Sequence, residues 1–181
     1  LFMLVDMHLH ESTYSSDSKM TLAEIVSDAK AKGLDGVCIT DHDSMGLKEV
    51  AEAYSKEVDF PIFVGVEYYS LWGDITACHP FRNNNRGLEH HLKDVHGLGG
   101  VEVLNGSTSL EANREALRYC NELGLVPIGA SDAHWTSQLG KYATYLPEDV
   151  RTIPDLVRVL KSGKCRPAIW TEEGYQVVET F

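Results

Sequence analysis

The chain alternates between short apolar runs with the two-residue period of a strand and longer segments with the 3.6-residue period of a helix. The first such pair is residues 3–9, "MLVDMHL", followed by residues 21–33, "TLAEIVSDAKAKG". In the second segment Thr21 and Glu24 match a capping box, and Gly33 is typical of the residue that ends a helix. We therefore expect the fold to be built from strand–helix units.

The same unit recurs along the rest of the chain. We expect strands at residues 36–40, 61–69, 75–79, 101–105, 126–130 and 141–146, and helices at residues 47–57, 110–123 and 154–161. Repeated units of this kind predict a parallel sheet, and the absence of a glycine-rich phosphate loop favours a barrel over a doubly wound nucleotide-binding sheet. The pattern alone leaves a closed barrel and an open sheet as alternatives.

Histidines and carboxylates stand at the carboxyl ends of the expected strands. On the first strand His8 and His10 share one face with Asp6, because side chains two apart in a strand point the same way. The pattern returns at later strand ends, in "ITDHD", "VGVEYY", "TACHP" and "GASDAH". The residues concerned, besides the two histidines, are Asp41, His42, Glu67, His79, Asp132 and His134. In a parallel barrel these strand ends lie at the face where the chemistry is done.

Such a cluster has the composition of a metal centre. A single histidine at a strand end is more often structural, but several imidazoles and carboxylates crowded together are costly to bury without a cation. Mixed imidazole and carboxylate ligands suit zinc, manganese or iron. Because the set is too large for one tetrahedral ion, we expect two or three divalent ions that share a bridging carboxylate.

Charge and hydropathy narrow the range of partners. The formal net charge of −11 argues against a basic surface for extended nucleic acid and fits a cation site, although acidic solubility explains most of it equally well. No apolar run approaches the ~20 residues that span a bilayer, and "LFMLV" is too short for a signal peptide and lacks its basic flank. We expect a cytoplasmic protein without membrane contact, folded as one domain over residues 1–181.

Seven segments form a specific set, in order from residue 6 to residue 134: "DMHLH", "SSDS", "GLDGVCITDHDSMG", "GVEYY", "HPFR", "VEVLNG" and "GASDAH". In these segments the chain resembles the PHP (polymerase and histidinol phosphatase) domain family. "HLH", "TDH" and "SDAH" are specific in combination, although each is weak alone. The resemblance implies a distorted (β/α)7 TIM-like barrel of parallel strands, with a trinuclear metal site at the C-terminal strand ends that hydrolyses phosphoesters.

The resemblance also implies a role for each matching residue. The implied metal ligands fall into three groups: His8, His10 and Asp132 for one ion; Glu67, which bridges to a second ion, and His79, which binds that second ion; and Asp17, His42 and His134 for the third. Asp41 is expected to orient a neighbouring ligand rather than to bind metal. The catalytic groups are then the bridging Glu67 and a metal-bound water, whose lowered pKa supplies hydroxide near neutral pH.

Three further residues near the same rim are candidates for contacts with a small phosphorylated substrate. Arg82, directly after "HPF", could grip a phosphate oxygen through its fork of donors, and the alternative is a surface arginine. Glu102 and Asn105 in "VEVLNG" are expected to support a ligand or to touch substrate. No motif for a serine or cysteine nucleophile accompanies them.

Three other functions stay open at this point. An amidohydrolase barrel also starts with H-x-H, but many members use a carboxylated lysine on a middle strand, where this chain has Glu67 and His79. An exonuclease-like enzyme of the same family would act on short oligonucleotides, although the chain lacks an aromatic and basic groove. A non-catalytic metal-binding interaction domain is the third alternative, and a nearly full ligand set argues against it.

The stretch between Glu67 and His79 is shorter than a parallel crossover requires. Only "YYSLWGD" separates Glu67 from the expected strand at residues 75–79, whereas parallel strands need about a dozen residues or more. A hairpin would fit, but it is expected to carry His79 away from Glu67. The resemblance also implies a further histidine ligand here, which the chain lacks. We therefore expect a segment of about 20 to 30 residues to be absent, as an omitted loop or a deletion, between Leu71 and Thr76.

Overall fold

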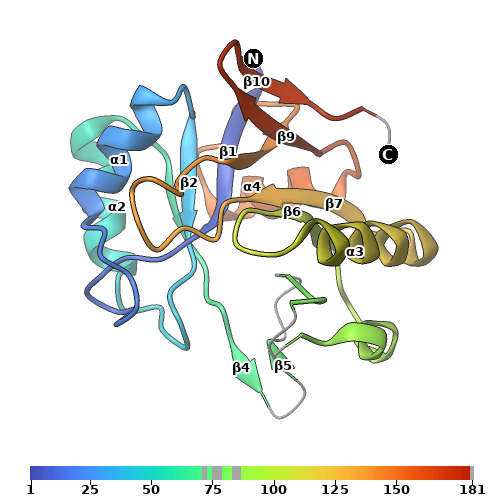
Figure 1. Cartoon of the computed structure of the whole chain (residues 1–181). Helices are drawn as coiled ribbons and strands as arrows, with labels where there is room; N and C mark the ends of the chain where they lie inside the picture. Colours follow the sequence, from blue (N-terminus) through green and yellow to red (C-terminus); the bar gives the residue numbers. More distant parts are fainter. Residues whose placement is uncertain (71–72, 75–78, 83–86, 180–181) are drawn as a thin grey trace.

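The computed structural model describes residues 1–70, 73–74, 79–82 and 87–179. Within them strands and helices largely alternate in a mixed α/β fold (Figure 1). The helices are α1 (Leu22–Ala31), α2 (Lys48–Val58), the 3-10 helix η1 (Glu89–Asp94), α3 (Leu110–Leu123) and α4 (Ile153–Lys161). The strands are β1 (Met3–Leu9), β2 (Gly36–Ile39), β3 (Ile62–Val64), β4 (Tyr69–Ser70), β5 (Gly73–Asp74), β6 (Gly100–Asn105), β7 (Val126–Ala130), β8 (Tyr142–Leu146), β9 (Arg166–Thr171) and β10 (Gly174–Val177).

The main sheet has six strands in the order β10–β9–β8–β1–β2–β3. Strands β1, β2 and β3 run parallel, whereas β8 is antiparallel to β1, and β9 and β10 continue the antiparallel order. Strands β6 and β7 form a separate parallel pair. The expectation of parallel strands throughout is therefore wrong for β8, because the link from β7 to β8 contains no helix to return the chain in a parallel sense. Among the described residues neither sheet closes into the expected barrel.

The carboxyl ends of β1, β2, β3 and β7 nevertheless meet at one place. Beyond the regular strands, the Asp132 amide donates to the His8 carbonyl at 2.8 Å and the His10 amide donates to the Ala133 carbonyl at 3.0 Å. A second parallel bridge joins His42 to Glu67 beyond β2 and β3. These contacts bring the segments that follow the four strands side by side, so a closed barrel is not needed to assemble the site.

Three apolar clusters hold this frame. On one face of the main sheet Leu9, Ile39 and Val64 pack with residues of α1 and α2. On the other face Val5 and other sheet residues pack against α4, and a third cluster joins η1, β6 and α3. Figure 1 shows α1 and α2 on one side of β1 and β2, and α3 alongside β6 and β7. Within the described chain no helix is long and apolar enough to cross a membrane.

Most of the expected elements are confirmed. The strands at residues 3–9 and 126–130 and the helix at residues 110–123 have the expected bounds, and the capping box of Thr21 and Glu24 is formed at α1. The pattern missed β9 and β10, and it extended β3 too far. Of the strand expected at residues 75–79, all but His79 lies outside the described residues.

The expected position of His79 after a hairpin is wrong. Strands β4 and β5 do pair antiparallel, yet His79 Nε2 lies 2.7 Å from Glu67 Oε1. The hairpin is paired outside the main sheet, as Figure 1 shows, so it does not carry the chain to the opposite end of the strands. The junction proposed between Leu71 and Thr76 falls largely outside the described residues, and an absent segment there stays a prediction.

We predict that Gly106→Ala destabilises the fold, because β6 and β7 end in close backbone contact. A Cβ atom at Gly106 would lie 2.4 Å from the Ser131 carbonyl oxygen, whereas a Cβ at Gly99 meets nothing within 4 Å. The expected loss in free energy of unfolding is about 1–3 kcal/mol for Gly106→Ala. Urea denaturation measures it, with Gly99→Ala as the matched control. Equal stabilities of the two variants would show that the strand ends can separate without cost.

Candidate metal centre

All eight residues expected as metal ligands lie together. Six of them come from the carboxyl ends of four strands, Asp17 comes from the β1–α1 connection, and His79 follows the β4–β5 hairpin. Ligand atoms of these side chains lie 2.7–3.8 Å from one another in a chain of contacts. The eight are His8, His10, Asp17, His42, Glu67, His79, Asp132 and His134.

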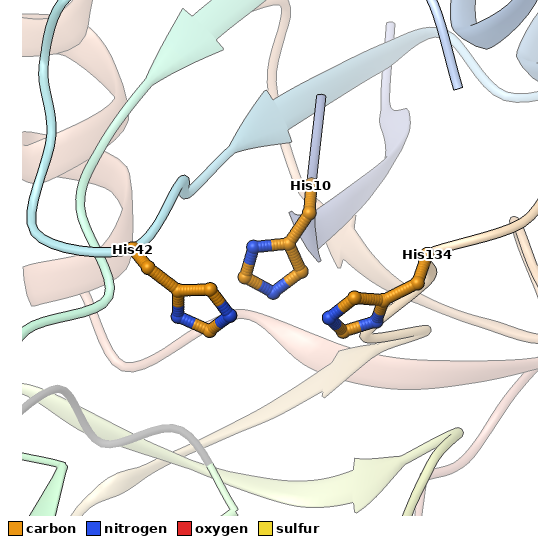
Figure 2. Close-up of side chains that lie close together, drawn as sticks. All are labelled: His10, His42 and His134. Atoms are coloured by element: carbon orange, nitrogen blue, oxygen red, sulfur yellow. The ribbon is translucent and has the colours of Figure 1, made fainter. Parts of the chain in front are cut away.

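Three overlapping groups of these side chains have ligand atoms within 4.8 Å of one another. Figure 2 shows one of them, in which His10, His42 and His134 converge from three different segments. The other groups are His8–His10–Asp132 and His8–Glu67–His79. Because His8 and His10 each belong to two groups, the side chains form one continuous cluster.

Glu67 lies at the middle of the cluster and spans it. Its Oε1 atom contacts His79 Nε2 at 2.7 Å. Its Oε2 atom lies 3.3 Å from the Nε2 atoms of His8 and His10 and 3.1 Å from Nδ1 of His42. None of the Oε2 contacts has the geometry of a hydrogen bond, and Asp132 Oδ1 is likewise buried without one. Two buried carboxylate oxygens that face several imidazole nitrogens suit a cation between them.

The ring nitrogens of His8 and His10 also indicate a cation site. Their Nε2 atoms lie 3.0 Å apart, while each Nδ1 atom has another partner, Glu102 for His8 and Ser15 for His10. Burial lowers the pKa of His10 to about 4, so this imidazole is neutral at physiological pH. With protons on both Nδ1 atoms, two Nε2 lone pairs face each other, and a bound cation removes their repulsion.

Asp41 is connected to a candidate ligand, His10, through Ser15. The Ser15 hydroxyl donates to Asp41 Oδ1 at 2.9 Å, so its oxygen is left to accept from His10 Nδ1 at 3.2 Å. The same carboxylate oxygen accepts from the Glu11 amide at 2.7 Å. This relay keeps the proton on Nδ1 and the lone pair on Nε2 of His10. Ser15 was missed in the sequence, although it lies in the "SSDS" segment.

Glu102 contacts the Nδ1 atom of His8, and Asn105 in turn donates to Glu102. Glu102 Oε1 accepts from His8 Nδ1 at 2.8 Å, and Oε2 accepts from Asn105 Nδ2 at 2.8 Å and from the His79 amide at 3.0 Å. Asn105 Nδ2 also lies 3.4 Å from Asp132 Oδ2. Both residues are buried and contact candidate ligands, a position that suits orienting those side chains.

The cluster shifts the pKa values of its own members. Burial alone would raise the pKa of Glu67, but the imidazoles of His42, His79 and His8 hold it well below its usual range. Contact with Glu67, opposed by burial, raises the pKa of His42 to about 9. The pKa of Asp132 is likewise lowered by nearby imidazoles against the effect of burial. Both carboxylates are thus held ionised, which is the state that binds metal.

The cluster has a buried side and an open side. His8, His10, Asp132 and Glu67 are at most 2% exposed, whereas the side chain of Asp17 is 51% exposed. His42 and His134 lie 3.1 and 3.3 Å from Asp17 Oδ2 through their Nε2 atoms. This group of side chains is therefore open to solvent.

Arg82 reaches the cluster from the segment after His79. Its guanidinium Nη1 atom lies 3.4 Å from Asp132 Oδ2 and from His79 Nε2, and its side chain is 25% exposed. This position excludes the alternative of an unattached surface arginine. A guanidinium that is part buried and part exposed at a metal-type cluster suits an anionic substrate group.

Asp6, which was expected to share a strand face with His8 and His10, precedes an irregularity in the register of β1 and takes no part in the contacts between candidate ligand atoms. Its Oδ1 atom accepts only from the backbone amide of His8, at 3.4 Å, among these residues. Its carboxylate accepts from the backbone amides of Ser131 and Gly140, and burial raises its pKa to about 6. The two-residue period shows which way a side chain points, but here it does not show which partner it meets.

Sequence comparisons give matches to part of the chain. A family model described as PHP-associated matches residues 111–165. Over 68 residues the chain is 35% identical to a protein of Thermotoga maritima provisionally named histidinol-phosphatase, covering 38% of this chain and 28% of that protein. Over 67 residues it is 33% identical to a 5'-3' exoribonuclease of Haemophilus influenzae, covering 37% and 24%. The matches thus span about a quarter of the length of these relatives.

Comparison with solved structures extends over nearly the whole chain. PsfC from Pseudomonas syringae aligns with a TM-score of 0.57 and 18% identity, covering 95% of this chain and 93% of that one. A protein of Bifidobacterium adolescentis, provisionally described as a metal-dependent phosphoesterase, aligns with a TM-score of 0.62 and 16% identity, covering 86% and 95%. At these identities the likeness concerns the fold.

We predict that Glu102→Gln weakens metal binding without unfolding the protein. The three partners of Glu102, on His8, His79 and Asn105, are all donors, so a glutamine amide group would face one of them. Metal affinity should fall about 10–100-fold. Competition with a chelator measures it, and Glu111→Gln, on the exposed side of α3, is the matched control. Unchanged affinity in Glu102→Gln would show that this carboxylate does not support His8.

Proposed function

We propose that the chain belongs to the PHP family and that it is a metal-dependent phosphoesterase that hydrolyses a small phosphomonoester or nucleotide. The proposal treats residues 1–181 as one phosphoesterase domain. It takes two or three divalent ions, zinc, manganese or iron, as cofactors. The relatives that are named as phosphatase or phosphoesterase support this reaction class.

The observation that carries the proposal is the position of Glu67. One of its oxygens contacts His79, and the other faces His8, His10 and His42. A carboxylate that reaches two sets of imidazoles with its two oxygens has the geometry of a bridge between two ions. A structural ion pair would need only one partner on one side.

The remaining ligands follow from the same contacts. We assign His8, His10 and Asp132 to a first ion, and His79 with Glu67 to a second. Asp17, His42 and His134 are assigned to a third, on the open side of the cluster. Divalent ions in such a set lower the pKa of a coordinated water and offset charge on a phosphoryl group.

The protein's own side chains prepare that chemistry. Glu102, and Ser15 with Asp41, hold two imidazoles in the tautomer that presents Nε2. Arg82 binds a phosphate oxygen beside Asp132, with which it is already in contact. The buried side of the cluster excludes water, which strengthens each of these electrostatic interactions.

A nuclease that acts on short oligonucleotides is the second candidate. The similarity to a 5'-3' exoribonuclease favours it, although the formal net charge of −11 does not suit a long polyanion. The two functions differ in what they release. Incubation of the protein and Mn²⁺ with a nucleoside monophosphate and with a 5'-phosphorylated trinucleotide distinguishes phosphate release from mononucleotide release.

We predict that the purified protein carries two or three transition-metal ions per chain and releases phosphate from a small phosphoester only when they are present. Glu67→Ala should abolish this activity almost entirely, by on the order of a hundredfold or more, because one side chain contacts both sets of imidazoles. Elemental analysis and a phosphate assay measure the two effects, and Glu172→Ala, in an exposed turn, is the control. Near-normal turnover in Glu67→Ala would rule out the bridge.

Arg82→Ala is predicted to raise KM with little change in kcat, if the guanidinium binds substrate and transition state equally. The expected rise is about tenfold or more, as for loss of a charged hydrogen bond. Arg82→Lys keeps the charge without the fork and should be intermediate. Steady-state kinetics on the best phosphomonoester gives both constants. A fall in kcat at constant KM would instead show that Arg82 binds the transition state but not the ground state of the substrate.

A further inference from the structure

One buried carboxylate, that of Asp6, accepts hydrogen bonds from both ends of the loop that connects β7 to β8. Asp6 is 0% exposed, and its Oδ1 atom accepts from the Ser131 amide at 2.9 Å while Oδ2 accepts from the Gly140 amide at 3.0 Å. Residues 131–140 form the loop between these two points. It carries Asp132 and His134, which lie in two of the three groups of candidate ligands.

The first of these ligands has a strained backbone. Asp132 has a φ of 52°, in the left-handed region that side chains other than glycine rarely adopt. Such a conformation persists only where the surroundings determine it. The amide of the preceding residue, Ser131, is the group that Asp6 Oδ1 holds. The strained residue, Asp132, therefore directly follows the residue whose amide Asp6 holds.

The other end of the loop is held from two further directions. The Tyr175 hydroxyl donates to the Gly140 carbonyl at 2.6 Å, and the Lys32 ammonium donates to the Leu139 carbonyl. Gly140 has a φ of 70°, and a Cβ there would lie 2.6 Å from the Tyr175 hydroxyl. The Asp6 carboxylate thus bonds to Ser131, which precedes the strained Asp132, and to Gly140, whose carbonyl is also held by Tyr175.

The energetic reason is the cost of the buried carboxylate. A charged group without solvent requires hydrogen-bond donors, and backbone amides bonded to a carboxylate give strong, charge-assisted bonds. Either amide could move away only by leaving that carboxylate with one donor fewer. The loop is therefore resistant to displacement at both ends.

We propose that Asp6 is a positioning residue that fixes the loop of residues 131–140, and with it the ions that use Asp132 and His134, without touching any ion itself. The inference rests on the proposed metal centre. The group that contains Glu67 and His79 takes no side chain from this loop, so it is an internal reference. Loss of Asp6 should weaken the loop-dependent ions and leave the ion at Glu67 and His79 in place.

The test uses Asp6→Asn in the full chain. The asparagine oxygen can accept from one amide, but its amide group faces the other donor, so one end of the loop is released. After equilibrium dialysis against Zn²⁺, Asp6→Asn should retain about one ion per chain where the unaltered protein retains two or three. Adding His79→Ala should remove that remaining ion. In the metal-free protein, hydrogen exchange at Ser131 or Gly140 should become faster in Asp6→Asn.

A matched control separates positioning from general stability. Thr144 is equally buried, and its hydroxyl bonds to the backbone of Gly129 in β7, outside the loop. Thr144→Val should lower the melting temperature without selective loss of ions. If Asp6→Asn keeps every ion at unaltered affinity, or loses all of them equally while folded, the inference is overturned.

Two further readouts keep the inference testable. If Asp6→Asn does not fold, Tyr175→Phe releases Gly140 from the other side and should produce the same selective loss on a smaller scale; no selective loss in that variant would overturn the inference. If the unaltered protein binds no divalent ion, the proposed metal centre fails, whereas unchanged amide exchange at Ser131 and Gly140 in Asp6→Asn would refute the restraint of the loop itself.

Discussion

The convergence of imidazole nitrogens on two buried carboxylates is the interaction on which the rest of the structure depends. Glu67 and Asp132 are ionised and almost fully buried, and the Nε2 atoms of His8 and His10 face each other at 3.0 Å. In a medium of low polarity this arrangement is unfavourable unless positive charge lies between the groups. The apolar clusters around the sheets hold the groups together, and the free energy of metal binding would then add to the free energy of folding.

The backbone can assemble this cluster without a closed barrel. What matters is that four segments leave their strands at the same edge, and the parallel register of β1, β2 and β3 provides three of them. The fourth, after β7, is attached to the end of β1 through His8, His10 and Ala133. The antiparallel strands β8 to β10 extend the sheet on its other side. None of the candidate ligands comes from these strands, so their direction does not affect the cluster.

Local patterns predicted most of the elements and placed seven of the eight candidate ligands at strand ends, because both depend on short-range periodicity, whereas Asp17 was expected only from the resemblance to the PHP family. A two-residue spacing brings together His8, in β1, and His10, one residue beyond its end, and the capping box of Thr21 and Glu24 fixes the start of α1. Partners that are distant in sequence were not predictable in this way. The direction of β8 depends on pairing across the sheet, and the carboxylate of Asp6 finds amides more than 120 residues away.

The return of His79 to Glu67 after the β4–β5 hairpin has the same explanation, since sequence spacing does not reveal a hairpin that lies outside the main sheet. His79 is further held by its own amide, which donates to the carboxylate that also orients His8. Glu102 therefore couples two candidate ligands from separate segments. A displacement of either His8 or His79 would disturb the other through this shared carboxylate, so these two candidate ligands are held together.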